Sequence, residues 1–205
     1  MRPRRPIRAE PARARLLLFH KPYGVLSQFT DAGGRSTLAD YIDVRDVYAA
    51  GRLDSDSEGL LLLTNSGYWQ HRISDPRQKM TKTYWAQVEG EVEKSAVFAL
   101  ESGVVLPDGP ATAVEARVLD EPDVAPRTPP IRERRSLPTS WIEITVAEGR
   151  NRMVRRMTAA VGYPTLRLIR VAIGPWQLGK LGPGEWREAS FPAPGETRSW
   201  QTTRP

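Results

Sequence analysis

Three carboxylates fall within five positions of the segment GRLDSDSEG at residues 51–59, namely Asp54, Asp56 and Glu58. Alternating acids are typical of calcium loops, but the glycine and the terminal glutamate of an EF-hand are missing at the required offsets. A carboxylate pair can also hydrolyse glycosides, although such pairs usually come from separate elements. Spacing alone does not overturn the simplest interpretation, an acidic surface turn.

Arginines gather at the start of a predicted helix in the segment EGRNRMVRRM at residues 148–157. With Asn151 as the N-cap, Arg152, Arg155 and Arg156 fall in about the first turn and share one face. Cations at this end oppose the helix macrodipole at a local cost of about 0.3–1 kcal/mol each. The pattern therefore predicts a nearby anion, either a phosphate backbone or an acidic side chain.

Charge is distributed unevenly along the 205 residues, which carry a formal net charge of +6. Residues 1–15 hold six arginines and one glutamate, residues 16–126 hold 10 basic and 17 acidic residues, and residues 127–205 hold 14 basic and 6 acidic residues. Basic ends of this kind are typical of a protein that binds a polyanion. A solvated surface explains so modest a net charge about equally well.

The composition excludes several classes of protein. Apolar residues make up 40% and charged residues 26%, as in ordinary globular proteins. The absence of cysteine excludes disulfides, thiolate zinc sites, iron–sulfur clusters and cysteine nucleophiles, and two histidines do not favour a metal site. Apolar runs such as residues 60–63 are too short to span a bilayer, and the N-terminus lacks the apolar core of a secretory signal. We expect a soluble cytoplasmic protein without a bound metal.

Strands and helices are predicted around both segments. Strands are expected at residues 16–19, within 47–63 on either side of the acidic loop, and at 82–88, 113–119, 141–146 and 166–173, with helices at 92–102 and 151–161. Residues 121–138 hold five prolines and four arginines, which predicts a long extended basic loop. This irregular order predicts a mixed α/β (α+β) fold with a largely antiparallel sheet and flanking helices.

Five segments together resemble the RsuA-type pseudouridine synthases, a family of RNA-modifying enzymes. The segments are FHKPYGVLSQFTD, GRLDSDSEGLLLLTNSG, KTYWAQVEG, PPIRERRSLPTSWIEITVAEGRNRMVRRM and PTLRLIRVAIGPWQLGKLGPGEWRE, in the family's order over about residues 16–190. The resemblance implies the pseudouridine synthase fold with a central RNA-binding cleft. We expect a catalytic domain at residues 15–190, a disordered basic arm at 1–14 and a tail at 191–205.

The resemblance implies an isomerase that breaks the bond from ribose C1′ to uracil N1 and rejoins the base through C5, with no cofactor. It implies that Asp54 is the nucleophile, that Arg155 pairs with it, and that Tyr84 stacks on the target base. The carboxylate can attack C1′, add to C6 or remove the C2′ proton, and the sequence does not choose among these routes. Such a pair would supply the anion that the arginine-bearing helix start lacks.

Other residues acquire roles by the same resemblance. Arg52 is similar to an arginine that fills the gap left by a flipped nucleotide, and Leu168 to an apolar residue under the base. Contacts with RNA phosphates are expected from six further arginines: Arg150, Arg152, Arg156, Arg132, Arg134 and Arg135. Met153 departs from the glutamine usual in the family, which predicts a changed hydrogen bond behind the site.

About fifteen residues precede the first predicted strand, so we expect no S4-type RNA-binding domain ahead of the catalytic domain. Within the family this points to members that act on 23S rRNA near the peptidyl-transferase centre. We expect a monomer that binds free 23S rRNA or a pre-50S particle. The alternatives are the same chemistry on 16S rRNA or tRNA, a non-catalytic ribosome-assembly factor, and a glycosidase built on Asp54 and Glu58, which leaves the basic half unexplained.

Overall fold

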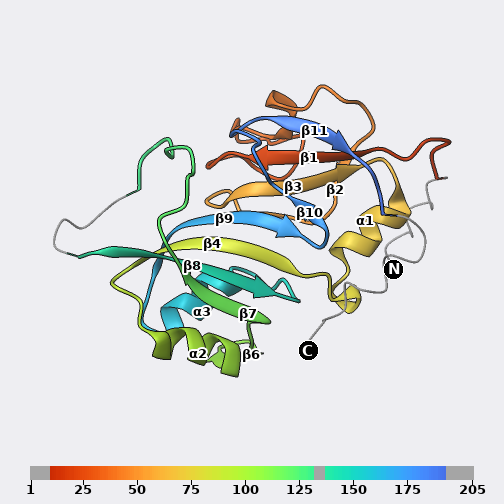
Figure 1. Ribbon diagram of the computed structural model, residues 1–205. Helices are drawn as coiled ribbons and strands as arrows, with labels where there is room; N and C mark the ends of the chain where they lie inside the picture. The colour runs from red at the N-terminus through yellow and green to blue at the C-terminus, as the bar shows by residue number, and fades with distance from the viewer. Residues whose placement is uncertain (1–9, 132–136, 193–205) are drawn as a thin grey trace.

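The protein is described by a computed structural model over residues 10–131 and 137–192 (Figure 1). Within these residues a nine-stranded sheet has the order β11-β1-β3-β9-β4-β8-β7, with β2 on β3 and β10 on β9. Its strands are β1 (Leu16–Lys21), β2 (Tyr48–Ala49), β3 (Glu58–Thr64), β4 (Lys82–Glu89), β7 (Glu115–Leu119), β8 (Thr139–Val146), β9 (Thr165–Ile173), β10 (Trp176–Gln177) and β11 (Trp186–Ala189). A separate pair joins β5 (Val104–Leu106) and β6 (Gly109–Ala111).

The helices are α1 (Gly67–Ser74), α2 (Lys94–Ser102) and α3 (Met153–Ala160), with short 3-10 turns η1 (Leu38–Asp40) and η2 (Pro76–Gln78). Figure 1 shows α2 and α3 together below β4, β8 and β7, and α1 at the opposite end of the molecule. No helix in the described ranges combines the length and apolar character needed to cross a membrane. All sheet pairings are antiparallel except β3 with β9, which confirms the expected mixed, largely antiparallel sheet.

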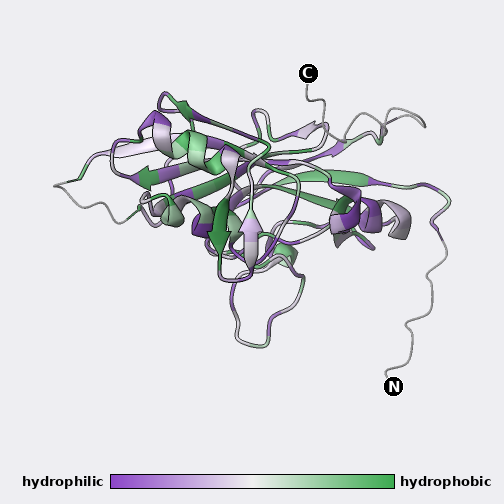
Figure 2. Ribbon diagram, turned by 90° about the horizontal axis from the view of Figure 1, so that it is seen from below, coloured by the Kyte–Doolittle hydropathy of each residue, from purple (hydrophilic) through white to green (hydrophobic). Residues whose placement is uncertain are grey.

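The core lies on both faces of the sheet. The apolar runs of β1 and β3 are buried along their whole length, because alternate side chains enter two different clusters. β4 sends Tyr84, Ala86 and Val88 into a third cluster, which α2 and α3 cover with Leu100 and Met157. Figure 2 shows long hydrophobic stretches along the strands, whereas the helices carry hydrophilic and hydrophobic residues together. Burial of alternate faces thus explains why these segments form strands.

Gly59 allows β3 to approach β9 directly behind the acidic loop. Its φ of +101° lies in the left-handed region, and a Cβ at this position would lie 2.3 Å from the Arg170 carbonyl oxygen. Only glycine therefore permits the parallel pairing of Glu58 and Gly59 with Ile169 and Arg170. This contact fixes the end of the acidic loop against the sheet.

Most predicted elements are confirmed, with three differences at helices. The second helix begins at Lys94 rather than residue 92. The arginine-rich helix begins at Met153, and Arg152 rather than Asn151 occupies its N-cap, without a side-chain capping bond. Helix α1 was not predicted, because Ile73 is its single buried residue and no apolar period marks it.

Glu10, within the segment 1–14 expected to form a disordered arm, contacts the start of α1. Glu10 accepts hydrogen bonds from the Ser66 hydroxyl and the Tyr68 amide at 2.6 and 2.7 Å, close to the helix start. The rest of the predicted arm, residues 1–9, lies outside the described residues. At the other end Phe191 stacks on Trp69 with ring centroids 4.5 Å apart, and the predicted tail beyond residue 192 also lies outside them.

The predicted extended loop contains no helix or strand over its described residues 121–131 and 137–138. It folds back over the sheet, where Ala125 accepts a hydrogen bond from Arg167. Farther along, the Arg127 guanidinium lies 4.2 Å from the centroid of the Tyr23 ring. Three arginines expected to bind phosphate, Arg132, Arg134 and Arg135, lie outside the described residues.

Candidate active site

A cavity of about 380 Å³ opens between the acidic loop, β4, β9 and the turn before α3. It brings together six of the residues singled out from the sequence: Arg52, Asp54, Tyr84, Arg150, Arg152 and Leu168. Arg155 and Arg156 are not among its lining residues. Segments distant in the sequence therefore meet at one concave site, as an active site requires.

The acidic loop is held by the turn that follows β1. The fully buried Lys21 ammonium donates to the carbonyls of Pro22 and Val25 at 2.9 and 2.8 Å, and burial lowers its pKa to about 8. The Gly24 amide donates to the Ser55 carbonyl at 2.7 Å. Because these contacts fix the backbone beside Asp54, that carboxylate is presented from a rigid support.

Leu53 anchors the same loop on its other side. Its buried side chain belongs to the cluster around Tyr84, and its backbone exchanges two hydrogen bonds with the Ser27 hydroxyl, at 2.7 and 3.1 Å. The next residue, Asp54, faces outward with 48% of its side chain exposed. In the described part of the chain its one ion-pair contact is to Arg152, 4.0 Å away. Asp54 thus keeps an open carboxylate at the edge of the cavity.

Asp56, two residues farther on, is bound much more tightly than Asp54. Arg152 donates to one of its oxygens at 3.0 Å and forms an ion pair with the other at 2.9 Å, and the Arg155 Nε lies 3.6 Å from the same carboxylate. Burial alone would raise the pKa of Asp56, but the hydrogen bond from Arg152 and the charge of Arg155 outweigh it and the pKa is lowered. The anion expected beside the arginine-bearing helix is therefore an internal carboxylate.

Arg155 contacts a different aspartate from the one expected. Its guanidinium donates to the backbone carbonyls of Asp56 and Thr165 at 2.7 and 3.3 Å and lies against the Asp56 carboxylate. Arg152 is the arginine nearest Asp54, because a left-handed backbone with φ of 49° turns it toward the acidic loop. A non-glycine residue in this conformation is uncommon and often marks a functional turn.

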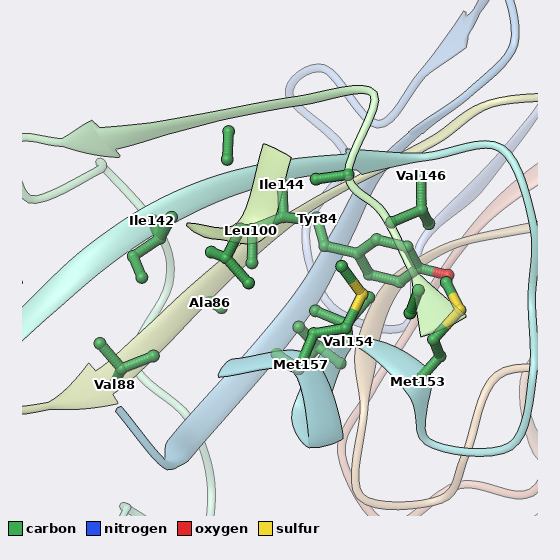
Figure 3. Close-up of a cluster of buried hydrophobic side chains, with 14 of the residues drawn as sticks. Tyr84, Ala86, Val88, Leu100, Ile142, Ile144, Val146, Met153, Val154 and Met157 are labelled. Carbon is green, nitrogen blue, oxygen red and sulfur yellow. The ribbon is translucent and has the colours of Figure 1, made fainter. Parts of the chain in front are cut away.

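Tyr84 and Leu168, on the paired strands β4 and β9, both line the wall of the cavity. Both are buried, at 8% and 6% exposure, in the cluster shown in Figure 3. The Tyr84 ring extends toward Met153, which also lines the cavity (Figure 3). Trp85 points to the other face of the sheet and donates from its indole to Glu143 at 2.8 Å. The cavity can thus hold a flat apolar group between an aromatic ring and a leucine.

Arg150 and Arg156, both expected to bind phosphate, are engaged by Asp108 in the β5–β6 turn. Arg156 forms a two-point contact with this carboxylate at 2.8 and 2.9 Å, and Arg150 lies 3.2 Å from it. The hydrogen bond from Arg156 is the main cause of the lowered pKa of Asp108. Arg150 also donates to the Pro110 carbonyl at 2.7 Å. The rim of the cavity is therefore already partly neutralised.

Two cationic residues of the cavity escaped the sequence analysis, Lys82 and Arg170. Lys82 lies two positions before Tyr84 on β4, and Arg170 lies two positions after Leu168 on β9. Side chains two positions apart in a strand point to the same face of the sheet, so both cations are expected on the cavity face. That signal was available in the sequence. Glu58, by contrast, is withdrawn from the site, because the buried Arg167 grips both its oxygens at 2.8 Å.

The site combines an open carboxylate, an aromatic and an aliphatic wall, and several fixed cations. Such a set suits attack by a carboxylate on a flat, anionic substrate, and it does not match a calcium loop because Glu58 points away. In the residues that the structure describes, no group of three or more acidic or histidine side chains converges as metal ligands. The geometry thus defines a carboxylate-based site for a planar polyanionic ligand.

Comparison with known proteins agrees with this class. A family model described as RNA pseudouridylate synthase matches residues 15–160. The chain belongs to the RNA pseudouridylate synthase family and is an RNA pseudouridine synthase, an isomerase. A crystal structure titled pseudouridylate synthase matches with a TM-score of 0.71 and 28% identity over 89% of this chain and 72% of that chain.

Individual relatives are similar over most of their length. The protein called ribosomal large subunit pseudouridine synthase E from Vibrio parahaemolyticus serotype O3:K6 is 53% identical over 85% of this chain and 73% of its own. A protein of the same name from Xanthomonas campestris pv. campestris is 56% identical over 84% of this chain and 94% of its own. These relatives confirm the resemblance on which the site residues were assigned.

Proposed function

We propose that this pseudouridine synthase isomerises one uridine of 23S rRNA in the large ribosomal subunit, near the peptidyl-transferase centre, with Asp54 as the nucleophile. Support for the substrate comes from the relatives at 53% and 56% identity, whose names specify the large ribosomal subunit. Support for the nucleophile comes from the single observation that Asp54 lines a cavity walled by Tyr84 and Leu168 with a half-exposed carboxylate that is held less closely than Glu148, which pairs with Arg150 at 3.3 Å.

In the proposed reaction the target uridine leaves the RNA stack and its base enters the cavity between Tyr84 and Leu168. Unstacking costs a few kcal/mol, and the exposed Arg52 beside the cavity is suited to occupy the vacated position. Asp54 then acts on C1′, C6 or the C2′ proton while the bond from C1′ to N1 breaks. The base turns, C5 bonds to C1′, the C5 proton leaves and N1 is protonated.

The arginines serve the nucleophile in two ways in this proposal. Arg152 places a positive charge 4.0 Å from the Asp54 carboxylate and is itself held by Asp56. Arg155 anchors the acidic loop through the Asp56 backbone and orients Asp54 by this route. In this proposal Arg152 and Arg155 are positioning residues. Arg155 therefore acts on Asp54 indirectly, through its contacts with Asp56, and not through the direct ion pair expected from the sequence.

RNA phosphates are proposed to bind around the rim of the cavity. Arg150 and Arg152 line the cavity, Arg156 shares Asp108 with Arg150, and the extended loop carries Arg132, Arg134 and Arg135 in the same basic half of the sequence. The protein is proposed to act as a cytoplasmic monomer on free 23S rRNA or a pre-50S particle. Position along the RNA would then be set by phosphate contacts and RNA shape rather than by base reading alone.

Pseudouridine mapping tests this proposal directly. Unmodified 23S rRNA, 16S rRNA and tRNA are incubated with the wild-type protein or Asp54→Asn, treated with carbodiimide and read by primer extension. We expect one new stop near the peptidyl-transferase centre of 23S rRNA, absent with Asp54→Asn. Stops only in 16S rRNA or tRNA would overturn the substrate, and a stop that persists with Asp54→Asn would overturn the nucleophile. Binding without any stop would favour an assembly factor.

A further inference from the structure

Two cations on the cavity wall, Lys82 and Arg170, have no acidic partner. They lie on the paired strands β4 and β9, and the register places Tyr84 of β4 opposite Arg170. In the part of the chain that the structure describes, neither makes an ion pair with a carboxylate. Arg150, Arg152 and Arg156 each form an ion pair with an aspartate, whereas Arg52 is exposed. The unneutralised charge is thus concentrated beside the proposed base-binding wall.

Lys82 retains donors for a ligand. Its ammonium donates to the Met80 carbonyl at 2.7 Å, and an ammonium has three protons to donate. Burial, together with the smaller effect of the Arg170 charge, lowers the pKa of Lys82 to about 8. Acidic groups do not offset this, although Asp54 and Glu148 line the same cavity. An anion in the cavity would stabilise the charged lysine.

Arg170 is a fixed second charge. It is 3% exposed, its Nε donates to the Leu60 carbonyl at 2.8 Å, and its Nη1 donates to the Arg52 carbonyl at 3.3 Å. Its Nη2 is buried without a hydrogen-bond partner. Because a buried charge without a counter-charge is costly, its retention beside a ligand cavity points to a negative charge supplied by the ligand.

The reaction itself creates such a charge inside the cavity. When the bond from C1′ to N1 breaks, its electron pair stays with the base and spreads onto the carbonyl oxygens O2 and O4. Addition of a carboxylate to C6 likewise pushes electrons onto O4. A preorganised cation near these oxygens stabilises the transition state more than the neutral ground state. Negative charge therefore develops on the base along every route open to Asp54.

We propose that Lys82 is a further catalytic residue, which donates a hydrogen bond to a uracil carbonyl oxygen and stabilises the charge developing on the base, while Arg170 reinforces its field. The electron pair returns when C5 bonds to C1′, the C5 proton leaves and N1 takes up a proton, so no co-reactant is needed. This inference rests on the proposed assignment of the cavity as the base-binding site. A phosphate of the RNA backbone is the competing source of negative charge.

The test compares Lys82→Met and Lys82→Arg with the wild type and with Lys180→Met, a matched change at an exposed lysine. Single-turnover rates are measured with saturating protein on whichever RNA the wild type modifies, and Kd is measured separately. We expect Lys82→Met to lower the rate about 10²–10³-fold, as removal of an oxyanion donor does, with Kd unchanged within about threefold. Lys82→Arg should retain most of the rate, and Lys180→Met all of it.

The pH dependence of the single-turnover rate distinguishes a catalytic role of Lys82 from a purely structural one. Lys82 is charged below its pKa of about 8, so the wild-type rate should fall as pH rises through this value. The cavity groups around it are Asp54, Tyr84, Arg170, and at the rim Glu148, Arg52, Arg150 and Arg152. Lys82→Arg should remove the fall, because arginine stays charged in this range.

Two results would overturn the inference. An unchanged rate at saturation with a weaker Kd and a shallower salt dependence in Lys82→Met would assign the lysine to a phosphate. A wild-type rate and pH profile in Lys82→Met would remove its role altogether. Failure of the proposed function is separate, because it appears as modification of another RNA by the wild type or as activity in Asp54→Asn. Thermal unfolding and RNA binding by Lys82→Met establish that it is folded.

Discussion

Arg167 and Arg170 lie three residues apart on β9, both buried, yet only one meets a carboxylate. Arg167, on the face away from the cavity, makes a two-point contact with Glu58. Arg170, on the cavity face, donates to two carbonyls and leaves Nη2 without a partner. Both side chains are removed from water, but only the charge of Arg167 is neutralised within the protein. The charge of Arg170 is left for a ligand in the proposal above.

The same contrast appears between the acidic residues of one loop. Asp56 is saturated by Arg152 and Arg155, whereas Asp54 is half exposed and reaches one arginine at 4.0 Å. A carboxylate committed to two cations is poorly suited to attack carbon, because its electron pairs are engaged. The two aspartates of this loop therefore differ in environment: Asp56 holds the arginines, whereas Asp54 stays accessible to a ligand.

Removing the satisfied partner should have the largest effect on stability. Glu58→Gln leaves the Arg167 guanidinium buried with no counter-charge, so we expect the free energy of unfolding to fall by about 3–5 kcal/mol. Urea denaturation of the purified protein measures this change. A loss below about 1 kcal/mol would show that the pair is not the structural charge described here.

The matched control is Glu188→Gln, which breaks an exposed pair with Arg15 at the sheet edge. Exposed ion pairs contribute less than about 1 kcal/mol, so this variant should unfold almost as the wild type does. Equal losses in the two variants would erase the distinction between buried and exposed pairs.

A smaller effect is expected at the rim. Asp108→Asn removes the carboxylate that Arg150 and Arg156 share, so both arginines become more available to phosphate, while Arg150 keeps its contact with Glu148 at 3.3 Å. We expect RNA affinity to rise a few-fold and the dependence of binding on salt to steepen by about one phosphate contact. Filter binding over a range of salt concentrations measures both.

Asp43→Asn makes the same change of net charge at an exposed position between η1 and β2. It should leave affinity and salt dependence close to those of the wild type. Equal gains in both variants would mean that overall charge, rather than release of the rim arginines, controls RNA binding.

Much of the fold could be predicted from local sequence. The alternation at Lys82–Val88 and the leucine run at Leu60–Leu63 each identify a strand, because burial of one or both faces leaves a clear pattern. Helix α1 left no such pattern, since most of its side chains face water. The contact of Glu10 with its first turn joins residues more than fifty positions apart, which no local window reports.

The sequence predicted which residues form the candidate site, but not which arginine pairs with which aspartate. Motifs identified Asp54, Tyr84 and Leu168, and the structure places them at one cavity. Which arginine meets which aspartate depends on side-chain directions that residue spacing does not determine. The left-handed backbone at Arg152 redirects that residue, and the β5–β6 turn brings Asp108 to Arg156. Partner choice is therefore a property of the tertiary structure.

The most direct test of the account compares Asp54→Asn with Asp56→Asn in single-turnover pseudouridine formation on the same RNA. Both changes remove one carboxylate charge from one loop while conserving size. We predict no detectable product with Asp54→Asn and unchanged RNA binding, whereas Asp56→Asn should slow the reaction about 10–100-fold by releasing its arginines. Normal turnover by Asp54→Asn, or loss of all product only in Asp56→Asn, would contradict the assignment of Asp54 as the reacting carboxylate.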